Sequence, residues 1–331
     1  MKLSLAIPTY NRGATLDIQL HDLCSQLSKL NRNDIEIVIQ DNCSPDSTSD
    51  ICKVLIENFP QLKIKYSQNE KNLGFDSNVD LSIQNSVGKY VWVISDDDHL
   101  CEGAVQTVIF ELDRFEGQFQ FAFVNYKISI DNVDSPLKCN LETKIISGEN
   151  FFSTTKLSSS FITSCIFEKK SWMSLDRLPY IGSMWIHVLA TREVLAKGKA
   201  LIIATPLIIM NKPSLEESRK EKESSKPDGI EFYTYAHITI TQFCQGLGLY
   251  GYPTLEVKSL DSLCRKEDVN QIINYKLTTK TYSIGECCKT LIAYHSIRGN
   301  EFGFYLLLAP LIIAPRSFFK LLRWVKNVCG K

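Results

Sequence analysis

The sequence lacks the features of a secreted or membrane-spanning protein. Its eleven cysteines stand at irregular spacings with no C-x-x-C pair, which argues against a disulfide framework or a zinc site and favours reduced thiols. No apolar run reaches the length of about 18 residues that suggests a membrane span. Residues 302–315 come nearest, and Pro310 interrupts them. Because Pro8 also comes too early for a signal peptide, we expect a cytoplasmic protein.

An excess of charge of either sign is missing as well. The 331 residues include 37 basic and 37 acidic ones, so net charge gives no reason to expect nucleic acid as a partner. The chain is 44% hydrophobic and 22% charged, which is the composition of an ordinary globular protein. Its length allows one large domain, or a core with a smaller second unit.

Two kinds of apolar pattern alternate along the first 126 residues. Apolar runs predict strands near residues 3–9, 35–41, 89–95 and 119–126, and the segment 62–69 predicts a further strand between them. Between these runs apolar residues recur at spacings of three and four, which predicts helices. Such alternation indicates an α/β fold with a mainly parallel, mixed sheet flanked by helices. In such sheets ligands bind outside the carboxyl ends of the strands, where the strand order changes direction.

The pattern changes after residue 126. Residues 127–213 contain shorter strand-like runs around a helical segment, and we assign them with residues 1–126 to one domain, 1–213. Residues 214–229 are densely charged and lie next to prolines, which predicts a mobile loop. The alternative is a lid that brings Arg219 or Lys220 to an anionic ligand.

The C-terminal region, residues 230–331, has a helical pattern throughout. Near its end, residues 316–327 mix four basic residues with large apolar ones. A basic amphipathic helix of this kind can lie in an anionic membrane interface. A helix docked on the protein with its basic face in water is the alternative.

Three consecutive aspartates, Asp96, Asp97 and Asp98, follow the apolar run that begins at residue 90. Adjacent carboxylates repel each other and are costly to bury without a counter-charge. A divalent cation such as Mg²⁺ or Mn²⁺ would supply that charge, since it takes carboxylate ligands together with substrate phosphates. The alternative is an acidic turn in which Asp98 caps the following helix.

Polar motifs also follow the other predicted strands. Residues 8–12, "PTYNR", follow the first strand, and Asp41 ends the second. Asp41 offers acceptors for a base or ribose, although its neighbours could simply build a turn. Near the third strand, Gly74 precedes a predicted helix that carries Asn78 one turn later. That helix start could meet phosphate or sugar oxygens.

In order and spacing these motifs resemble the family 2 glycosyltransferases, whose nucleotide-sugar-binding fold is called GT-A. The resemblance rests on "PTYNR", "DN-S-D-T", "N-G---N" and the acidic triplet, over about residues 1–126. It extends weakly to about residue 213, and to bacterial O-antigen abequosyl- and rhamnosyltransferases. It implies a nucleotide-sugar-binding half, 1–126, and an acceptor half, 127–213.

The resemblance also implies roles for individual residues. Asp97 and Asp98 would bind the metal, and Asp41 would bind the base. Ser95 stands where the commoner D-x-D-D pattern has its first aspartate, so the assignment within the triplet stays open. The substrate-binding residues would be Pro8, Thr9, Tyr10, Asn11, Arg12, Asp41, Asn72, Gly74, Asn78 and Asp96.

The general base departs from the family pattern. Many relatives have a Glu-Asp pair after the central strands, and residues 150–210 contain none. His187 stands where a carboxylate is expected, and its ordinary pKa range suits proton transfer. A packed helical histidine is the structural alternative, and Asp176 is the alternative base.

We therefore expect an inverting, metal-dependent glycosyltransferase. It would move a sugar from a nucleoside diphosphate donor to a lipid-linked oligosaccharide in O-antigen or other surface polysaccharide synthesis. The enzyme would lie peripherally on the inner face of the cell membrane. A sugar nucleotidyltransferase is one alternative, although "PTYNRGA" lacks the glycine-rich loop usual there. A non-catalytic nucleotide-sugar-binding subunit is the other.

Overall fold

A computed structural model describes most of the first two thirds of the chain and isolated later residues. The described residues are 1–30, 32–130, 133–136, 141–156, 158–211, 243, 247–250, 252, 257, 258, 262 and 313. The chain divides into two compact units, Met1–Lys212 with Tyr250–Tyr252, and Pro213–Leu249 with Pro253–Lys331. The loop predicted at 214–229 and the amphipathic tail at 316–327 lie outside the described residues.

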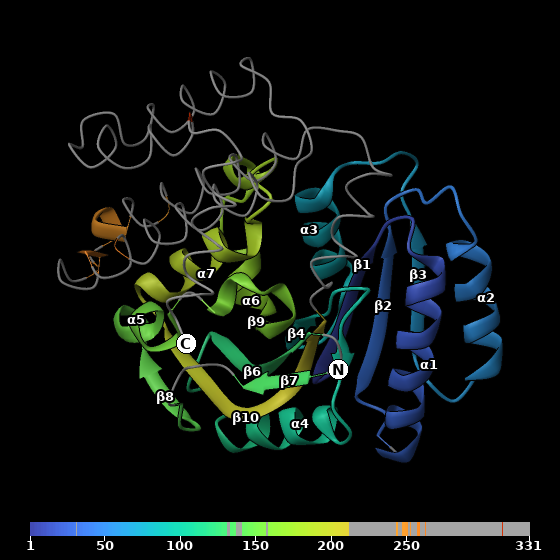
Figure 1. Cartoon of the computed structure of the whole chain (residues 1–331), viewed down its shortest axis with the longest axis horizontal. Coiled ribbons are helices and arrows are strands. Elements are labelled where there is room, and N and C mark those ends of the chain that lie inside the picture. Colours follow the sequence, from blue (N-terminus) through green and yellow to red (C-terminus); the bar gives the residue numbers. More distant parts are fainter. Residues whose placement is uncertain are drawn as a thin grey trace, which may run out of the picture. The chain divides into compact units, whose positions relative to one another are not determined.

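One ten-stranded sheet organises the first unit (Figure 1). Its strand order is β3-β2-β1-β4-β9-β6-β10-β5, with β7 paired to β6 and β8 to β10. The strands are β1 (Leu3–Thr9), β2 (Ile35–Asp41), β3 (Ile64–Gln68), β4 (Tyr90–Val93), β5 (His99–Leu100), β6 (Phe121–Ile130), β7 (Val133–Pro136), β8 (Lys144–Ser147), β9 (Cys165–Glu168) and β10 (Lys199–Asn211).

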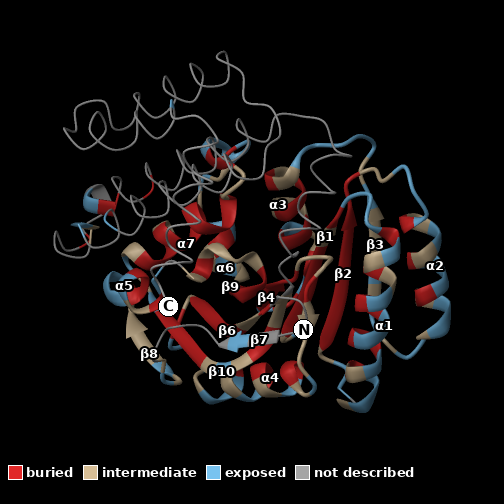
Figure 2. Ribbon diagram, viewed as in Figure 1, coloured by how far each residue is buried: buried red, intermediate tan, exposed pale blue. Residues whose placement is uncertain are grey.

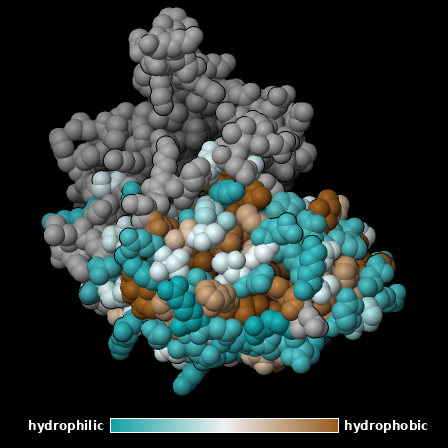
Figure 3. Space-filling model, turned by 90° about the horizontal axis from the view of Figure 1, so that it is seen from below, coloured by the Kyte–Doolittle hydropathy of each residue, from teal (hydrophilic) through white to brown (hydrophobic). Residues whose placement is uncertain are grey.

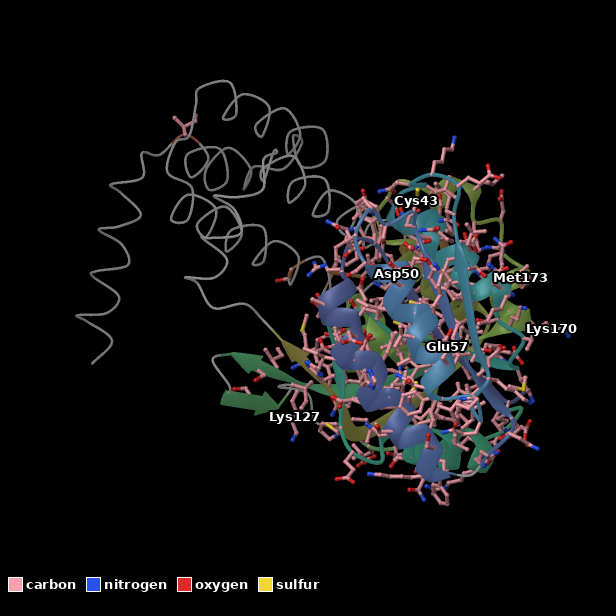
Figure 4. All side chains as sticks on the ribbon, turned by 90° about the vertical axis from the view of Figure 1, so that its right-hand side faces the viewer. Cys43, Asp50, Glu57, Lys127, Lys170 and Met173 are labelled. Carbon is pink, nitrogen blue, oxygen red and sulfur yellow. The ribbon has the colours of Figure 1, made fainter. Side chains whose placement is uncertain are left out.

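The sheet is mixed. Strands β1 to β4 are mutually parallel, as are β6 and β10. Strand β9 lies antiparallel between β4 and β6, and β6 with β7 forms a hairpin that extends from the body of the sheet (Figure 4). The strand order reverses at β1, with β2 and β3 on one side and β4 on the other. This switch point is where an α/β sheet offers a ligand site.

Helices flank this sheet, which confirms the predicted fold class. Helix α1 packs against α2 and α4, whereas α3 packs against β1, β2 and α7 (Figure 1). The α-helices are α1 (Gly13–Leu30), α2 (Thr48–Asn58), α3 (Phe75–Asn85), α4 (Ala104–Arg114), α5 (Phe151–Thr155), α6 (Lys169–Met173) and α7 (Ile186–Ala196). Short 3₁₀ helices are η1 (Gly148–Asn150), η2 (Ser158–Ser160), η3 (Ile162–Ser164), η4 (Leu178–Tyr180) and η5 (Leu247–Tyr250).

The apolar runs of the sequence form the centre of the sheet. Every residue of β2 and β4 is buried (Figure 2), as expected for parallel strands covered on both faces. Helix α1 carries one of the predicted apolar patterns, a stripe of leucines at spacings of four and three, and Leu16, Leu20 and Leu23 of this stripe are buried. Burial of such side chains contributes roughly 1.5–3 kcal/mol each. This core holds the strand ends, and therefore the polar loops, in fixed positions.

Residues 158–168 belong to one of the strand-like runs predicted after residue 126, but only part of this run forms a strand. Two 3₁₀ helices, η2 and η3, precede the short strand β9. The Ser164 hydroxyl donates a 2.6 Å hydrogen bond to the Phe161 carbonyl. Such local bonds compete with a sheet ladder, so only the last four residues of the run become a strand.

Apolar side chains on the surface are dispersed over several elements. Figure 3 shows apolar residues between hydrophilic ones across the face seen from below. Phe110 of α4, Ile18 of α1 and Leu178 of η4 are the kind of isolated exposed residues that globular proteins commonly carry. Within the described ranges, no helix combines the length and apolar character needed to cross a bilayer.

Candidate active site

The loops after β1 and β4 meet at the switch point of the sheet. The Thr9 hydroxyl, at the end of β1, donates a 2.7 Å hydrogen bond to Asp96 Oδ2. The Tyr10 backbone N–H also bonds to the Asp96 carboxylate. The motif at residues 8–12 and the acidic triplet, predicted separately, therefore lie together, and Tyr10, Asn11 and Arg12 remain exposed.

The loop after β2 joins the same site through Ser44. Its hydroxyl accepts the Asn11 N–H at 2.9 Å and donates to Asp41 Oδ1 at 2.6 Å. Close by, Asp46 Oδ2 accepts the Gly13 N–H at 2.9 Å. A Cβ atom at Gly13 would stand 3.0 Å from Ser47 Oγ and 3.2 Å from Asp46 Oδ2. Glycine fits here with the two turns closely packed, and a larger residue would require these side chains to shift by a few tenths of an ångström.

Asp41 is completely buried and strongly hydrogen-bonded. Its Oδ2 accepts bonds from Tyr66 Oη at 2.7 Å and Gln68 Nε2 at 2.9 Å, and Oδ1 accepts two from Ser44. Burial and the bond to Asp41 both raise the pKa of Tyr66. With about four acceptor sites already used, Asp41 ties β2, β3 and the loop together. Contact with a nucleobase would require one of these donors to be exchanged.

Side-chain amides connect the ends of β1, β2 and β3. Asn42 Oδ1 accepts from Asn69 Nδ2 at 2.9 Å, while Asn42 Nδ2 donates to Asn72 Oδ1 at 2.9 Å. Asn72 Oδ1 also accepts the Gly74 N–H at 2.8 Å. Gly74 has φ of 83°, a conformation that favours glycine. These bonds fix the turn that leads into α3.

Asn78 lies buried beneath that turn on α3. Its Nδ2 donates to the Gln40 carbonyl at 2.9 Å, and its Oδ1 accepts from Asn69 at 3.0 Å. The predicted substrate-binding residues Asn72, Gly74 and Asn78 are thus brought together beside β1 and β2. In this geometry Asn72 and Asn78 hydrogen-bond within the protein and hold α3 at the strand ends.

Hydrogen bonds from two distant elements shape the acidic triplet. The Thr163 hydroxyl of η3 accepts the Ser95 N–H at 2.9 Å and donates to Asp98 Oδ2 at 2.5 Å. From α1, Gln19 Nε2 donates to the carbonyls of Asp98 and Ser95. The Ser95 hydroxyl donates to Asp97 Oδ1 at 2.6 Å. Ser95, which replaces an aspartate of the usual pattern, is therefore a hydrogen-bond donor within the turn.

The triplet carries negative charge that the fold leaves poorly compensated. Asp98 is 4% exposed, and burial raises its pKa to about 7, opposed by the Thr163 bond and increased by Asp97 and Asp96. Burial also raises the pKa of Asp96, and the Thr9 bond and the Arg12 charge lower it. Among the described residues, the two charges that raise the pKa of Asp98 are those of Asp97 and Asp96, and both are negative.

These carboxylates fit a divalent cation. Their oxygens are the donors that Mg²⁺ and Mn²⁺ prefer, and a cation would neutralise the buried charge of Asp96 and Asp98. Within the described part of the chain, no three His, Cys, Asp or Glu side chains form a metal cage. Mg²⁺ is commonly held by one or two carboxylates plus substrate phosphates. Such a site needs fewer carboxylates than the triplet contains.

His187, the predicted base, lies in the first turn of α7 and is 3% exposed. Its Nε2 lies 2.9 Å from the Ser160 carbonyl oxygen, which can only accept, so Nε2 carries the proton and Nδ1 is the free acceptor. Burial lowers the pKa of His187 to about 4, and the Ser160 bond opposes this shift. The imidazole is therefore neutral at pH 7. Asp176, the alternative base, is exposed in the turn after α6.

Three residues of the site escaped the sequence motifs. Thr163 and Gln19 hold the triplet, and Asp76 holds the segment before α7. Asp76 is buried, and its carboxylate accepts the backbone N–H groups of Met184 at 2.7 Å and Ile186 at 3.2 Å. Local patterns could not identify these contacts, because each joins residues at least 65 positions apart.

Solved structures support the fold. S. aureus TarS, residues 1–349, superposes with a TM-score of 0.63 over 90% of this chain and 81% of that chain, at 13% identity. The mannosyltransferase PcManGT from Pyrobaculum calidifontis, solved with GDP-Man and Mn²⁺, gives a TM-score of 0.53 over 100% of this chain and 88% of that chain, at 11% identity. At these identities the likeness concerns the fold, which is that of the GT-A glycosyltransferases.

Sequence relatives point to the same family. The abequosyltransferase RfbV of Salmonella typhimurium is 27% identical over 263 residues, which cover 75% of this chain and 78% of the relative. A GalNAc(5)-diNAcBac-PP-undecaprenol beta-1,3-glucosyltransferase of Campylobacter jejuni is 31% identical over 108 residues, a third of each chain. The profile described as Glycosyl transferase family 2 matches residues 4–172. This chain belongs to glycosyl transferase family 2.

Proposed function

We propose that the protein transfers one sugar, with inversion, from a nucleoside diphosphate donor to a lipid-linked oligosaccharide in O-antigen or other surface polysaccharide assembly. The main support for a donor site is the Thr9–Asp96 hydrogen bond, because it joins the 8–12 motif to the acidic triplet. Related folds have been solved with UDP-GlcNAc and with GDP-Man and Mn²⁺. The Salmonella abequosyltransferase supports a role in surface polysaccharide assembly. The Campylobacter glucosyltransferase, whose name includes an undecaprenol-linked saccharide, supports a lipid-linked acceptor.

The donor would lie across the ends of β1, β2 and β4. Tyr10, Asn11 and Arg12 are exposed there and available to the nucleotide. Pro8, Thr9 and Asp41 form the floor beneath them, and Asp41 would meet the base only by exchanging a hydrogen bond. Asn72, Gly74 and Asn78 shape the neighbouring turn, whose backbone would face sugar or phosphate oxygens.

Asp97 and Asp98 would hold the cation, with Asp96 oriented beside them by Thr9. When bound, Mg²⁺ or Mn²⁺ stabilises the negative charge of the departing diphosphate. Thr163 and Gln19 keep the turn in shape for this purpose. The cation would then be bound through carboxylates whose turn is already held in shape before the ion arrives.

His187 is the proposed general base. The acceptor hydroxyl oxygen bonds to the anomeric carbon as the bond from that carbon to the diphosphate breaks, and the hydroxyl proton passes to Nδ1. A neutral imidazole with a free Nδ1 has the required lone pair. Asp176 is the carboxylate alternative.

Membrane attachment completes the proposal. Residues 316–327 contain Arg316, Lys320, Arg323 and Lys326 among large apolar side chains. Such a segment would hold the enzyme on the inner face of the cell membrane, close to a lipid-linked acceptor.

Incubation with a panel of nucleotide sugars, with and without Mn²⁺, tests this function. We expect Mn²⁺-dependent release of nucleoside diphosphate, and none from Asp97→Ala. Asp50→Ala is the control, since Asp50 lies exposed on α2 (Figure 4). Pyrophosphate exchange would indicate a nucleotidyltransferase, and binding without turnover a non-catalytic subunit. Full activity of Asp97→Ala in excess chelator would exclude the metal role.

A further inference from the structure

Two polar atoms at the start of α7 are buried and have no hydrogen-bond partner within the described part of the chain. They are the indole Nε1 of Trp185 and Nδ1 of His187. The two rings are nearly parallel, with centroids 5.9 Å apart and planes 28° from each other. A buried polar group without a partner costs about 1–3 kcal/mol. Native proteins keep few such groups, so a neighbouring pair needs a physical explanation.

The two atoms have complementary hydrogen-bonding character. The indole N–H of Trp185 can only donate. Nδ1 of His187 can only accept, because Nε2 carries the proton that bonds to the Ser160 carbonyl. A hydroxyl group both accepts and donates, and sugars present several hydroxyls on one ring. The ring centroids lie 5.9 Å apart, a separation comparable with the width of one sugar residue.

The backbone around this pair is fixed in advance. Asp76 accepts the N–H groups of Met184 and Ile186, which flank Trp185. Gly182 and Met184 have φ of 88° and 64°, and such conformations persist only where the surroundings hold them. Because Asp76 supplies those contacts from α3, the segment needs little reordering when a ligand binds.

We propose that Trp185 and His187 form a hydroxyl-binding subsite for the acceptor saccharide, with Asp76 as its positioning residue. This inference rests on the proposed function and names Trp185 as a substrate contact. The acceptor hydroxyl oxygen accepts a hydrogen bond from the indole N–H of Trp185, and the hydroxyl donates its own hydrogen bond to His187 Nδ1. Trp185 is half-buried, so part of its ring reaches the surface, whereas its Nε1 and His187 Nδ1 are buried and become accessible to a saccharide hydroxyl when the side chains over them move.

Stability measurements separate a binding role from a packing role. Trp185→Phe loses indole volume, as any Trp→Phe change does, but its N–H has no partner among the described residues, so we expect a smaller drop in melting temperature than in a control whose N–H is hydrogen-bonded. Trp172→Phe is the matched control, because Trp172 Nε1 donates a 2.8 Å bond to Asp80. That variant should melt at a lower temperature. A drop for Trp185→Phe as large as that of Trp172→Phe would mean that the indole N–H has a partner in the free protein, and would overturn the proposal.

Saccharide binding gives a second readout that needs no turnover. The full chain contains four tryptophans, and the indole N–H resonance missing from Trp185→Phe identifies Trp185. Methyl glycosides of glucose, galactose, mannose and rhamnose serve as probes. We expect at least one to shift that resonance, and to bind about tenfold more weakly to Trp185→Phe, the effect of one lost hydrogen bond. Trp172→Phe should bind as the wild type does.

The outcomes distinguish this inference from the proposed function. If none of the four glycosides shifts the Trp185 resonance, or if Trp185→Phe binds them as the wild type does, the subsite is wrong even where donor turnover is observed. If the glycosides bind at Trp185 and no nucleotide sugar is turned over, the proposed function fails and the saccharide site stands.

Discussion

Single buried hydroxyls and carboxylates decide the geometry of the site at the residue scale. Thr163 accepts one hydrogen bond from Ser95 and donates another to Asp98. The same residue fixes Trp92, whose Nε1 donates to the Thr163 carbonyl at 2.7 Å. One threonine thus connects the end of β4 to the aspartates that follow it.

Replacement of Thr163 by valine tests this role. The variant keeps the shape and loses the hydroxyl, leaving Ser95 N–H and Asp98 without that partner. We expect a loss of about 1–3 kcal/mol in the free energy of unfolding, measured by urea denaturation, and weaker Mn²⁺ binding. Thr163→Ser should restore both. Equal stability of the valine variant and the wild type would show that the hydroxyl is dispensable.

The depressed pKa of His187 predicts a pH-dependent stability. Between pH 6.5 and 4 the unfolded chain protonates this imidazole while the native state does not, so the native state loses stability as the pH falls. A shift from 6.5 to about 4 corresponds to a loss of about 3 kcal/mol between neutral pH and pH 4.

Comparison with His187→Gln isolates that contribution. The raised pKa values of Asp98, Asp96 and Asp76 act in the opposite direction, but both proteins share them. As the pH is lowered through this window, the wild type should therefore lose more unfolding free energy than the variant does. A difference that stays constant from pH 7 to pH 4 would contradict the buried neutral imidazole.

At the scale of elements, α3 links the two halves of the site. Its start carries Gly74 and Asn78 beside the strand ends, and its inner face carries two aspartates one turn apart. Asp76 holds the segment before α7, and Asp80 accepts bonds from Trp172 and, at 2.7 Å, from Arg177 Nε. A single helix therefore sets the spacing between the donor turn and the proposed acceptor segment.

Asp76→Asn should release the segment before α7. An amide offers one oxygen in place of two and directs an NH₂ group at backbone donors. We expect faster hydrogen exchange at the amides of Met184 and Ile186. The matched variant Asp80→Asn removes a part-buried carboxylate from the same helix and should leave those two amides protected. If both variants change them equally, the effect is a general loosening of α3 and not a specific clamp.

At the scale of the whole molecule, the tail would bring the enzyme to its acceptor. Replacement of Arg316, Lys320, Arg323 and Lys326 by glutamine removes four positive charges, each worth about 1 kcal/mol near an anionic surface. We expect the wild type to float with vesicles containing phosphatidylglycerol and the variant to remain unbound. High salt should weaken wild-type binding. Flotation of both proteins to the same extent would exclude a charge-based attachment.

The sequence predicted the strand–helix order well because its signals are local. The short apolar runs that became β2 and β4 can be recognised in an isolated segment, and so can the three-and-four spacing of the leucines of α1. The run at 158–168 was harder, because hydroxyl-to-carbonyl bonds inside it favour 3₁₀ helices over a strand. Polar motifs at strand ends were also recognisable, since a parallel sheet places all its carboxyl ends at one edge.

The sequence by itself determined that the 8–12 motif, Asp41 and the acidic triplet follow buried strands, and hence their common edge. Only the tertiary structure decided which groups they meet. Thr9 reaches Asp96 across 87 positions, Thr163 reaches Asp98 across 65, and Asp76 reaches Met184 across 108. Such pairings depend on strand order and helix packing, which bring distant residues within hydrogen-bond range and which no local pattern encodes. The same burial decides the pKa of Asp98 and His187, because the charged forms lose their hydration only in the folded state.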